Sequence, residues 1–416
     1  MAAVPAQPAR PHRAPTRPAR AAVLASATLT IMAAAIISPS LPAMREVFAG
    51  TPGADLLVRF TLTVTSLAIA VSAPACGLVA DRLGRRPLLV FGLVLYAVSG
   101  TAGFFVTDLY VLLATRALLG AAAGGIMTAV SATITDWFNG PRRASFLGLQ
   151  QVFASLGGVV FLPLAGLLAT ISWRAPLWIY TASAAVAVLA IRALRHEPRT
   201  EPAEAPGRSP HRPGRMRTGS ILGVYALALA ATLVFYMAPT QLPFLLRSHG
   251  SGPAAAGAVI AGSTLSSAAG ALAFPALRRR LTPTVITTAG IGLLGAGWLL
   301  VGTAPGVAQI AAGLLVGGLG VGLVVPNLNL RLSEIAHPHR RGRVLSGLVT
   351  GIFLGQFLSP LAVQPLIQST GIAAAFTWTG TALAAAAALT AITALPTRTS
   401  PDRDTPPPTH PTERKT

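Results

Sequence analysis

Residues 77–87 read Gly-Leu-Val-Ala-Asp-Arg-Leu-Gly-Arg-Arg-Pro and place a dense cluster of charges between two long apolar segments. Each segment is long enough to cross a bilayer as a helix. The connection between them is so short that the two helices must be antiparallel neighbours. Gly77 and Gly84 permit close approach and a tight turn there, and Asp81 lies among the arginines at the water boundary.

The composition indicates a membrane protein. Of the 416 residues, 52% are hydrophobic and only 11% are charged, and the mean hydropathy is +0.63. A soluble domain of this size would expose far more charge. The formal net charge is nevertheless +20, from 32 Lys and Arg against 12 Asp and Glu. Such an excess is also typical of nucleic-acid-binding proteins. The location of the basic residues along the chain therefore has to distinguish a membrane protein from a nucleic-acid-binding one.

Apolar segments of about 20 residues recur along the whole chain. The only cysteine, Cys76, lies inside the second of them, so no disulfide within the chain is possible. The pattern predicts an all-α membrane protein with twelve transmembrane helices, at residues 21–44, 56–80, 88–106, 109–133, 145–169, 175–194, 220–246, 254–277, 284–303, 308–332, 344–368 and 372–395.

The basic residues gather on one side of the expected membrane, in both tails and in every second loop. Lys and Arg near the ends of spans favour the cytoplasmic side. We therefore expect a multi-pass protein of the cell (inner) membrane with both termini in the cytoplasm, and no binding of nucleic acid. The loop clusters are Arg82 to Arg86, Arg142 with Arg143, the run from Arg192 to Arg217, Arg278 to Arg280, and Arg331 to Arg343.

The motif at residues 77–87 resembles the loop between helices 2 and 3 of the major facilitator superfamily of secondary transporters, G-x-L-x-D-R-x-G-R-R/K. The resemblance implies two pseudo-symmetric six-helix bundles, and the chain carries traces of such a repeat. At an offset of 198 residues, Gly120 and Gly124 correspond to Gly318 and Gly322.

The charged ends of the two halves also correspond. At the offset of 198, Asp136 corresponds to Glu334, and each acid precedes two arginines at the same spacing. At an offset of 193, Phe274 replaces Asp81, so the loop motif is degraded in the second half. Further matches at this offset are Gly77 with Gly270, Arg85 with Arg278 and Arg86 with Arg279.

The composition divides the chain into five parts. Its two ends and its centre are rich in Pro and Arg, which is typical of segments without a packed core. We expect a disordered cytoplasmic tail at 1–20, an N-terminal six-helix bundle at 21–194, a cytoplasmic linker at 195–219, a C-terminal six-helix bundle at 220–395 and a second disordered tail at 396–416.

The resemblance implies that the loop motif is a conformational latch. In relatives, its acid docks on the N-terminus of helix 11 and pairs with the arginine four residues later, which a second acid at the end of helix 4 also holds. These parts fall on Asp81, Arg85 and Asp136, with helix 11 beginning near Val344. A carboxylate at a helix N-terminus gains dipole interactions, and breaking the contact on cytoplasmic opening gives two states. A charged turn is the alternative for the motif residues Gly77, Asp81, Arg82, Gly84, Arg85 and Arg86.

Two further motifs resemble those of exporters in the superfamily. In the fourth expected helix, Arg116, Gly120 and Gly124 follow one another at four-residue spacing, which lets a neighbouring helix approach closely. We expect Arg116 to face the cavity beside the first helix, with snorkelling to the outer surface as the alternative. Both motifs favour export. The one in the fifth helix is kept only in part, at Gly148, Gly157 and a displaced Pro163.

Coupling to protons is implied by the resemblance alone. A proton relay normally needs a titratable group inside the membrane, but the acids of this chain lie near the ends of spans or outside them. Glu46 near Arg116, or Asp55 with Arg59, are the coupling candidates at the outer side. For Asp55 and Arg59 an ordinary surface ion pair is the alternative.

The substrate is expected to bind between the two halves near the bilayer midplane. Because no acid lies there, we expect a neutral or anionic amphipathic small molecule. Asn327 follows a proline and Gln241 lies between two, so these residues could instead cap interrupted turns. The candidate lining is Gln150, Gln151, Tyr236, Gln241, Asn327, Asn329 and Gln356.

No motif of an enzyme, no Walker loop and no Cys/His cluster is present, so we expect no catalysis, no cofactor and no metal. The first hypothesis is a secondary active transporter that exports a drug or metabolite by alternating access. It would act as a monomer in the lipid bilayer, with a small-molecule substrate and with protons as an open coupling partner. The alternatives are an uncoupled facilitator, an importer of small solutes and a transport-inactive membrane sensor.

Overall fold

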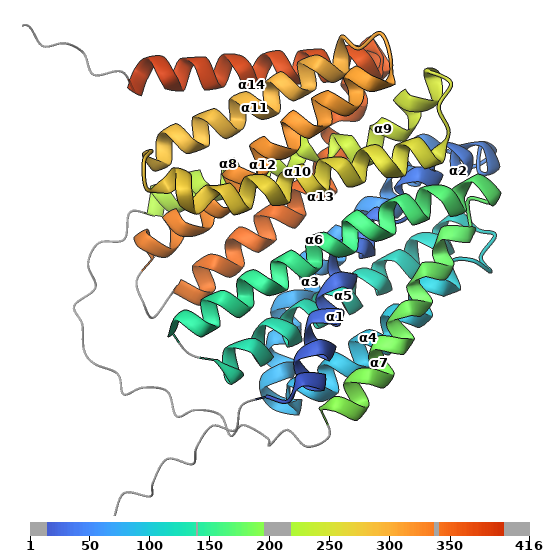
Figure 1. Cartoon of the computed structure of the whole chain (residues 1–416). Helices are drawn as coiled ribbons and strands as arrows, with labels where there is room; N and C mark the ends of the chain where they lie inside the picture. Colours follow the sequence, from blue (N-terminus) through green and yellow to red (C-terminus); the bar gives the residue numbers. More distant parts are fainter. Residues whose placement is uncertain (1–14, 139, 195–217, 337–340, 395–416) are drawn as a thin grey trace, which may run out of the picture.

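The computed structural model describes residues 15–138, 140–194, 218–336 and 341–394, and the regular structure in these ranges is helical (Figure 1). The elements are α1 (Arg17–Ala35), η1 (Ser38–Ser40), α2 (Leu41–Val47), α3 (Ala54–Leu83), α4 (Arg85–Ala102), α5 (Leu109–Trp137), α6 (Gly140–Ile171), η2 (Ala175–Thr181), α7 (Ala182–Ala193), α8 (Thr218–Phe235), α9 (Met237–Ser248), α10 (Pro253–Arg278), α11 (Pro283–Gly302), α12 (Val307–Ile335), α13 (Arg341–Thr370) and α14 (Ile372–Ala394).

Eleven segments of the described chain are long and apolar enough to cross a membrane. Three of them are composite and consist of α1 with η1 and α2, of η2 with α7, and of α8 with α9. The remaining expected span is α4, which has 18 residues, begins with two arginines and packs against α5 and α7. Together these segments account for the twelve spans expected from the sequence.

The first and seventh spans are interrupted at corresponding places. In the first, the continuous helix ends before η1, which contains Pro39, and Pro42 follows near the start of α2. In the seventh, the break between α8 and α9 falls at Tyr236, shortly before Pro239. A proline lacks the backbone donor that a continuous helix needs at that position.

The helices form two bundles, α1–α7 and α8–α14 (Figure 1). In the first bundle α5 packs against α3, and in the second α12 packs against α10, so the helices that carry the repeated glycines make corresponding contacts. Glycines make both contacts. A Cβ added at Gly120 would lie 2.3 Å from the carbonyl oxygen of Thr65, and one at Gly322 would lie 2.1 Å from that of Ser267. No other residue permits backbones to approach so closely.

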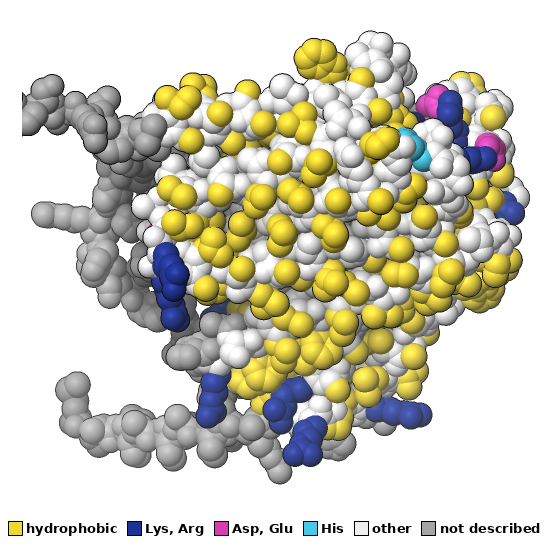
Figure 2. All heavy atoms as spheres, turned by 45° about the horizontal axis from the view of Figure 1, so that its top comes forward, with side chains coloured by type: hydrophobic (Ala, Val, Ile, Leu, Met, Phe, Trp, Pro, Cys, Tyr) yellow, Lys and Arg dark blue, Asp and Glu magenta, His cyan; other side chains and the backbone are white. Residues whose placement is uncertain are grey.

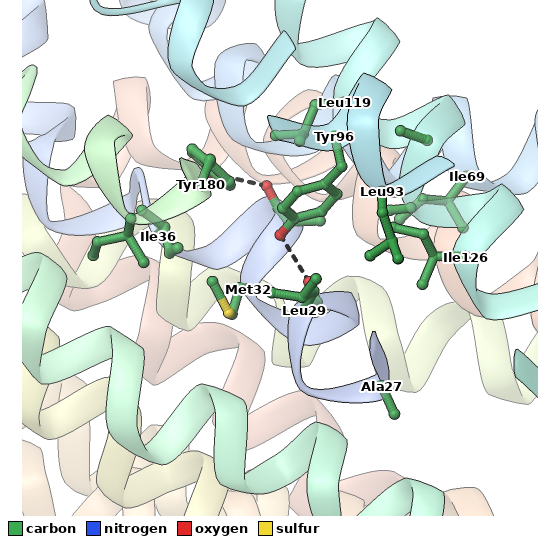
Figure 3. Packing of buried hydrophobic residues seen from close by; sticks show 14 of the residues in the cluster. Ala27, Leu29, Met32, Ile36, Ile69, Leu93, Tyr96, Leu119, Ile126 and Tyr180 are labelled. Atoms are coloured by element: carbon green, nitrogen blue, oxygen red, sulfur yellow. Dashed lines mark hydrogen bonds between the residues drawn. The ribbon is translucent and has the colours of Figure 1, made fainter. Parts of the chain in front are cut away.

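Two tyrosines anchor the core of the first bundle (Figure 3). Tyr96 of α4 and Tyr180 of η2 are buried, and their ring centroids lie 5.5 Å apart in an edge contact. Tyr96 donates to the carbonyl of Leu29 at 2.8 Å, and Tyr180 donates to that of Ala33 at 3.0 Å. Both carbonyls belong to α1, so each buried hydroxyl is satisfied while it ties its own helix to the first span.

The bundles meet where α6 packs against α10 and α3 against α13. We call the end that carries residues 77–87 the inner end and the opposite end the outer end. Toward the outer end, a Cβ at Gly257 would lie 2.4 Å from the carbonyl oxygen of Leu162, and one at Gly166 2.7 Å from that of Pro253. The closest backbone contacts described between the bundles are therefore near the outer end.

Large apolar side chains cover the outside of both bundles. Phe91 is 66% exposed, Leu272 70% and Ile171 79%. Figure 2 shows hydrophobic side chains spread over the broad middle of the molecule, while acidic and basic side chains lie together at its right-hand end. Such a surface is costly in water and is covered by lipid in a membrane.

The first helix begins earlier than expected. Arg17 is its first residue, Thr16 caps it by accepting a hydrogen bond from the backbone of Ala19 at 3.4 Å, and a proline stands in its first turn. Residues 17–20 are therefore helical and not part of the expected disordered tail. The rest of the expected tails and nearly all of the linker lie outside the described residues, at 1–14, 195–217 and 395–416.

Candidate functional site

Three charged side chains meet at the inner end of the first bundle. Arg85 has its Nη1 atom 3.3 Å from Asp81 Oδ1 and its Nε atom 3.0 Å from Asp136 Oδ2. Arg85 also donates to the carbonyl of Ala80 at 3.0 Å. The turn that returns the chain over α3 passes through Gly84, whose φ of +93° favours glycine. One guanidinium therefore ties α3, α4 and α5 together.

The other face of this cluster is open to solvent. The side chain of Asp81 is 71% exposed. Its expected docking on the helix that begins near Val344 is not among the contacts of the described residues, and the side chains of 341–343 lie outside them. Gly77 was expected to permit a close approach, but nothing lies within 4 Å of a Cβ added there. The exposed charged residues of the motif are Asp81, Arg82 and Arg86.

The second bundle keeps half of this cluster. Arg278 Nη2 lies 3.8 Å from Glu334 Oε1, at the positions that correspond to Arg85 and Asp136. Phe274 takes the place of the other acid and is buried in an apolar cluster. The carboxylate that the second bundle lacks is the one expected to dock on the opposite bundle.

Arg116 is fully buried, but it does not face the interface between the bundles. Its Nη2 atom donates to the carbonyls of Ser99 and Gly100 at 3.1 and 2.7 Å, and its guanidinium lies 5.2 Å from the ring centre of Tyr180. Both carbonyls belong to the last turn of α4, where partial negative charge accumulates. The expected cavity-facing position is wrong, because the cation finds its partners inside the first bundle.

The glycines of the two helical motifs differ in their surroundings. Gly120 and Gly124 both face α3. A Cβ at Gly157 would lie 2.1 Å from a backbone oxygen of α1, so α6 touches the first span there. By contrast, nothing lies within 4 Å of a Cβ at Gly148. Helix α6 runs through Pro163 without interruption.

A buried arginine joins the two bundles at the outer end. Arg59 of α3 is 4% exposed, its Nε atom donates to Gln241 Oε1 at 3.0 Å, and its guanidinium lies 4.5 Å from the ring centre of Phe244. Both partners belong to α9 of the second bundle. Arg59 Nη1 is also 4.0 Å from Asp55 Oδ1. The expected ion pair between Asp55 and Arg59 is therefore present, but it is not an ordinary surface pair, since Arg59 is enclosed by the opposite bundle.

Two exposed ion pairs complete the outer network. Glu46 of α2 pairs with Arg247 of α9, so this pair also crosses between the bundles. Arg45 pairs with Asp55. The expected proximity of Glu46 to Arg116 is wrong, because Glu46 is exposed and pairs with Arg247, whereas Arg116 is buried between α4 and Tyr180.

Sequence reasoning missed Arg247, although a signal for it exists. Positions 46 and 247 differ by 201, and so do Ser38 and Pro239, where the serine hydroxyl donates to the proline carbonyl. This offset is close to that of the repeat, and equivalent segments of two pseudo-symmetric halves meet at the axis between them. The interrupted spans at these corresponding positions also indicate where a binding site lies.

Three of the expected lining residues lie at the interface. Gln356 of α13 accepts a hydrogen bond from Ser66 of α3 at 2.8 Å. Gln241 accepts from Arg59, as described. Tyr236 belongs to the second bundle but is packed into the apolar core of the first. Ser66 was missed, because one serine within an apolar span has no spacing that distinguishes it.

Asn327 does not lie at the interface. Its Nδ2 atom donates to the carbonyl of Pro283 and to Thr287 Oγ1, each at 2.7 Å. It therefore joins α12 to the start of α11. The prediction that Asn327 lines the cavity is wrong, because these two acceptors hold its side chain on the face of α12 that packs within the second bundle.

The other expected polar residues make contacts within their own bundle or face solvent. Asn329 donates to the carbonyl of Val325 in its own helix at 3.1 Å. Gln150 of α6 donates to Ser131 of α5 at 3.2 Å, and Gln151 is exposed. None of these contacts joins the two bundles.

The groups that gather between the bundles are amides, hydroxyls, the guanidinium of Arg59 and, at the outer end, the ion pair of Glu46 with Arg247. In the described ranges, no three His, Cys, Asp or Glu side chains are grouped so as to hold a metal ion. The side-chain contacts that cross the interface lie between its middle and its outer end, whereas the inner cluster is confined to one bundle. Such an arrangement can bind a small molecule and change shape around it.

Among curated proteins with similar sequences, one is an efflux pump by name and another is a quinolone resistance protein by name. The chain is 28% identical over 150 residues to "Efflux pump dotC" of Dothistroma septosporum, across 35% of this chain and 24% of that protein. It is 26% identical over 171 residues to "Quinolone resistance protein NorA" of Staphylococcus aureus, across 41% of this chain and 43% of that protein. The match thus spans less than half the length of either relative.

Three solved transporters share the fold. The D-xylose-proton symporter has a TM-score of 0.71 at 16% identity and covers 90% of this chain and 96% of its own. The nucleoside transporter NupG has a TM-score of 0.70 at 12% identity, with 90% and 99% covered. The human organic anion transporter MFSD10 has a TM-score of 0.66 at 18% identity, with 91% and 100% covered. At these identities the likeness concerns the fold alone.

The family comparison covers both bundles. The sequence model of the Major Facilitator Superfamily matches residues 23–360 and 224–415. Its two matches together extend from the first span to beyond the last one. The chain is therefore a membrane transporter of the Major Facilitator Superfamily, not an enzyme.

Proposed function

We propose that this transporter exports a small amphipathic drug or metabolite by alternating access. The main support is that the two ends of the interface between the bundles differ. At the outer end, Glu46 and Arg59 contact the second bundle, whereas at the inner end Gly77 and Gly148 face open space. A substrate from the inner side would therefore reach the interface first. The name of one curated relative, an efflux pump, supports export, and the resistance named for another is consistent with it, while a proton symporter with the same fold leaves the direction to be tested.

The inner charge cluster would supply the switch between the two states. Arg85 holds Asp81 and Asp136 together, and the exposed carboxylate of Asp81 lies at the end of α3, next to where the inner ends would close. On closing, that carboxylate would meet the N-terminus of α13 and gain contacts to its free backbone amides. The cluster would then stabilise the state in which the outer end is open.

Exchange for protons would act through the outer acids. Glu46 pairs with Arg247, and Asp55 pairs with Arg45 and lies near Arg59. A proton taken up by Glu46 from the outer side would release Arg247 and loosen the outer closure. An uncoupled facilitator is the alternative, because the described acids lie near the ends of spans and not in their middle.

Transport by membrane vesicles tests the direction. Inverted vesicles from an efflux-deficient host that expresses the protein should accumulate at least one compound of an amphipathic panel, and cells should retain less of the same compound. Vesicles with Gly120→Val are the control, since the added side chain would collide with the backbone of α3. Uptake into right-side-out vesicles without export from cells would instead show an importer.

Neutral variants of the outer acids test the coupling. Glu46→Gln and Asp55→Asn should lower the sensitivity of transport to a protonophore. Asp108→Asn is the matched control at the outer side, because Asp108 caps α5 by accepting from the amides of Tyr110 and Val111, and Asn caps a helix equally well. If both interface variants stay as protonophore-sensitive as the control, the outer acids do not couple protons.

A further inference from the structure

A cavity of about 390 Å³ lies between the bundles at the outer end, and five charged side chains line it. Its apolar wall includes Phe244, Ile367 and Ile372. A neighbouring cavity of about 620 Å³ shares part of the charged wall. Figure 2 shows acidic and basic side chains side by side at one end of the molecule. We call the smaller cavity the outer vestibule, and its charged lining is Arg45, Glu46, Asp55, Arg59 and Arg247.

The charges of the outer vestibule do not cancel. Three guanidinium groups face two carboxylates, which leaves one positive charge. Glu46 is paired with Arg247, and Asp55 with Arg45, so each carboxylate has a close partner of its own. Arg59 lies 4.0 Å from the same Asp55 oxygen that Arg45 binds, and its nearer partners are neutral. Arg45 and Arg59 therefore share one carboxylate, and the excess positive charge belongs to Arg59, the more distant of the two.

The excess positive charge lies on a buried side chain. Arg59 is 4% exposed, while the side chains of the four other charged residues are between 47% and 63% exposed. A buried cation without its own counter-ion is costly, and an anion that reaches it removes that cost. Gln241 adds a second donor beside Arg59, because its Oε1 faces the guanidinium and its buried Nε2 has no partner among the described contacts.

We propose that the outer vestibule is an exit site for an organic anion, a carboxylate or sulfonate on an apolar body. Its charged group pairs with Arg59 and competes with Glu46 for Arg247, and its apolar body lies against Phe244 and Ile367. This inference rests on the proposed export and names its substrate class. A neutral or cationic molecule would leave the charge of Arg59 uncompensated.

Binding in the outer vestibule also affects the outer closure. The pair between Glu46 and Arg247 crosses from one bundle to the other. An anion that takes Arg247 away from Glu46 breaks one of the contacts that hold the outer ends together. The anion therefore binds more tightly to the outward-open state and shifts the population toward it.

Equilibrium dialysis of the purified full chain in lipid nanodiscs tests the proposal with tritiated 2-naphthoate as the probe. Competition with 2-naphthamide and 2-naphthylmethylammonium compares the three charge types on one ring system. Naphthoate should bind at least about tenfold more tightly than the other two, since a charge-assisted pair with a buried guanidinium is lost in both. Equal binding of naphthoate and naphthamide would overturn the proposal.

Variants of the vestibule arginines and of Glu46 test where naphthoate binds and whether each charge strengthens or weakens its binding. Arg59→Gln should weaken naphthoate binding about tenfold, and Glu46→Gln should strengthen it about threefold because it frees Arg247. Arg174→Gln is the matched control, an outer arginine that donates to the carbonyl of Val106 away from the vestibule, and it should leave binding unchanged. If Arg59→Gln fails to fold, Arg247→Gln at a half-exposed position carries the same test.

The outcomes separate this inference from the proposed function. If Arg59→Gln binds naphthoate as tightly as the control Arg174→Gln does, the anion binds elsewhere and the site is overturned, even if vesicles export other compounds. The same holds for Arg247→Gln where it replaces Arg59→Gln. Weaker binding by Glu46→Gln would overturn the competition with Arg247. Naphthoate binding that follows the expected order, without export of any compound by inverted vesicles, would support the vestibule and overturn export.

Discussion

Two buried arginines illustrate how differently one residue type is used in this transporter. Arg116 contacts two carbonyls at the end of α4 and an aromatic ring, all within the first bundle. Arg59 contacts Gln241 and Phe244 of the second bundle, both neutral. Arg116 can therefore keep its partners throughout a transport cycle, whereas the contacts of Arg59 must break when the outer end opens.

Arg116→Ala should destabilise the protein without changing its substrate affinity. The variant leaves the carbonyls of Ser99 and Gly100 buried without a donor, and we expect a loss of about 2–4 kcal/mol in the free energy of unfolding. Thermal unfolding in detergent measures it, with Thr115→Ala as the control because Thr115 bonds only within its own helix. An unchanged melting temperature together with a raised KM would return Arg116 to the cavity.

The two acids around Arg85 should differ in their effect on stability. Asp136 is 22% exposed and lies 3.0 Å from Arg85, while Asp81 is 71% exposed and lies 3.3 Å from it. Asp136→Asn should therefore lower the stability of this conformation by about 1 kcal/mol, and Asp81→Asn should lower it by less. Transport should instead fall sharply in Asp81→Asn at equal membrane abundance. Wild-type transport in Asp81→Asn would reduce the motif to a charged turn.

The motifs and the hydropathy predicted how deep in the membrane a residue lies better than they predicted which neighbour its side chain faces. Asp81, Arg85 and Asp136 were expected together and are together, because the short loop and the family pattern restrict where they can lie. Arg116 and Asn327 were expected at the interface and point away from it. Which face of a helix packs inside its bundle depends on neighbours far along the chain, and an apolar span gives little amphipathic signal for it.

At the scale of elements, glycines fix how closely the helices pack. Gly120→Ala and Gly322→Ala should each lower stability by about 1–3 kcal/mol, since the added Cβ atoms would lie 2.3 and 2.1 Å from backbone oxygens that can move only with their helices. Gly148→Ala is the control, because nothing lies within 4 Å of its Cβ. Melting temperatures of the three variants in one detergent should show the difference. Equal values would mean that the helix contacts adjust freely.

The spans themselves were predictable, but their interruptions were not. About 20 apolar residues suffice to predict a helix that crosses the membrane, and each expected span has its helix. The breaks at η1 and before α9 follow from prolines whose effect depends on tertiary contacts, such as the bond from Ser38 to Pro239. The start of α1 at Arg17 was missed, because hydropathy marks where the membrane begins and the cap at Thr16 marks where the helix begins.

At the scale of the whole molecule, the distribution of arginine predicts the orientation. In a Cys76→Ser background, single cysteines at positions 10, 208 and 415 should resist a membrane-impermeant reagent in intact cells, because basic segments stay in the cytoplasm. Cysteines at Gly252 and Ala304, at the outer ends of α10 and α11, should react. Labelling at 208 from outside the cell would invert the assignment of inner and outer ends.

The two charged networks should shift one conformational equilibrium in opposite directions. Glu46→Gln removes a contact of the closed outer end and favours the outward-open state. Since that pair is half-exposed, the shift should be about 1 kcal/mol, a factor of roughly five in the population ratio. Asp81→Asn removes the charge expected to hold the inner ends together in the other state, so it favours the inward-open one.

A cysteine at Gly148 reports on this equilibrium, because the site faces open space at the inner end in the present conformation. Its labelling by a maleimide in purified protein should slow in Glu46→Gln and should not slow in Asp81→Asn. The double variant should lie between the two single ones, since distant sites contribute additively. If Glu46→Gln and Asp81→Asn both slow the labelling, the inner and outer networks do not act on one alternating equilibrium, because a single equilibrium cannot be displaced to the same side by loosening its two opposite ends.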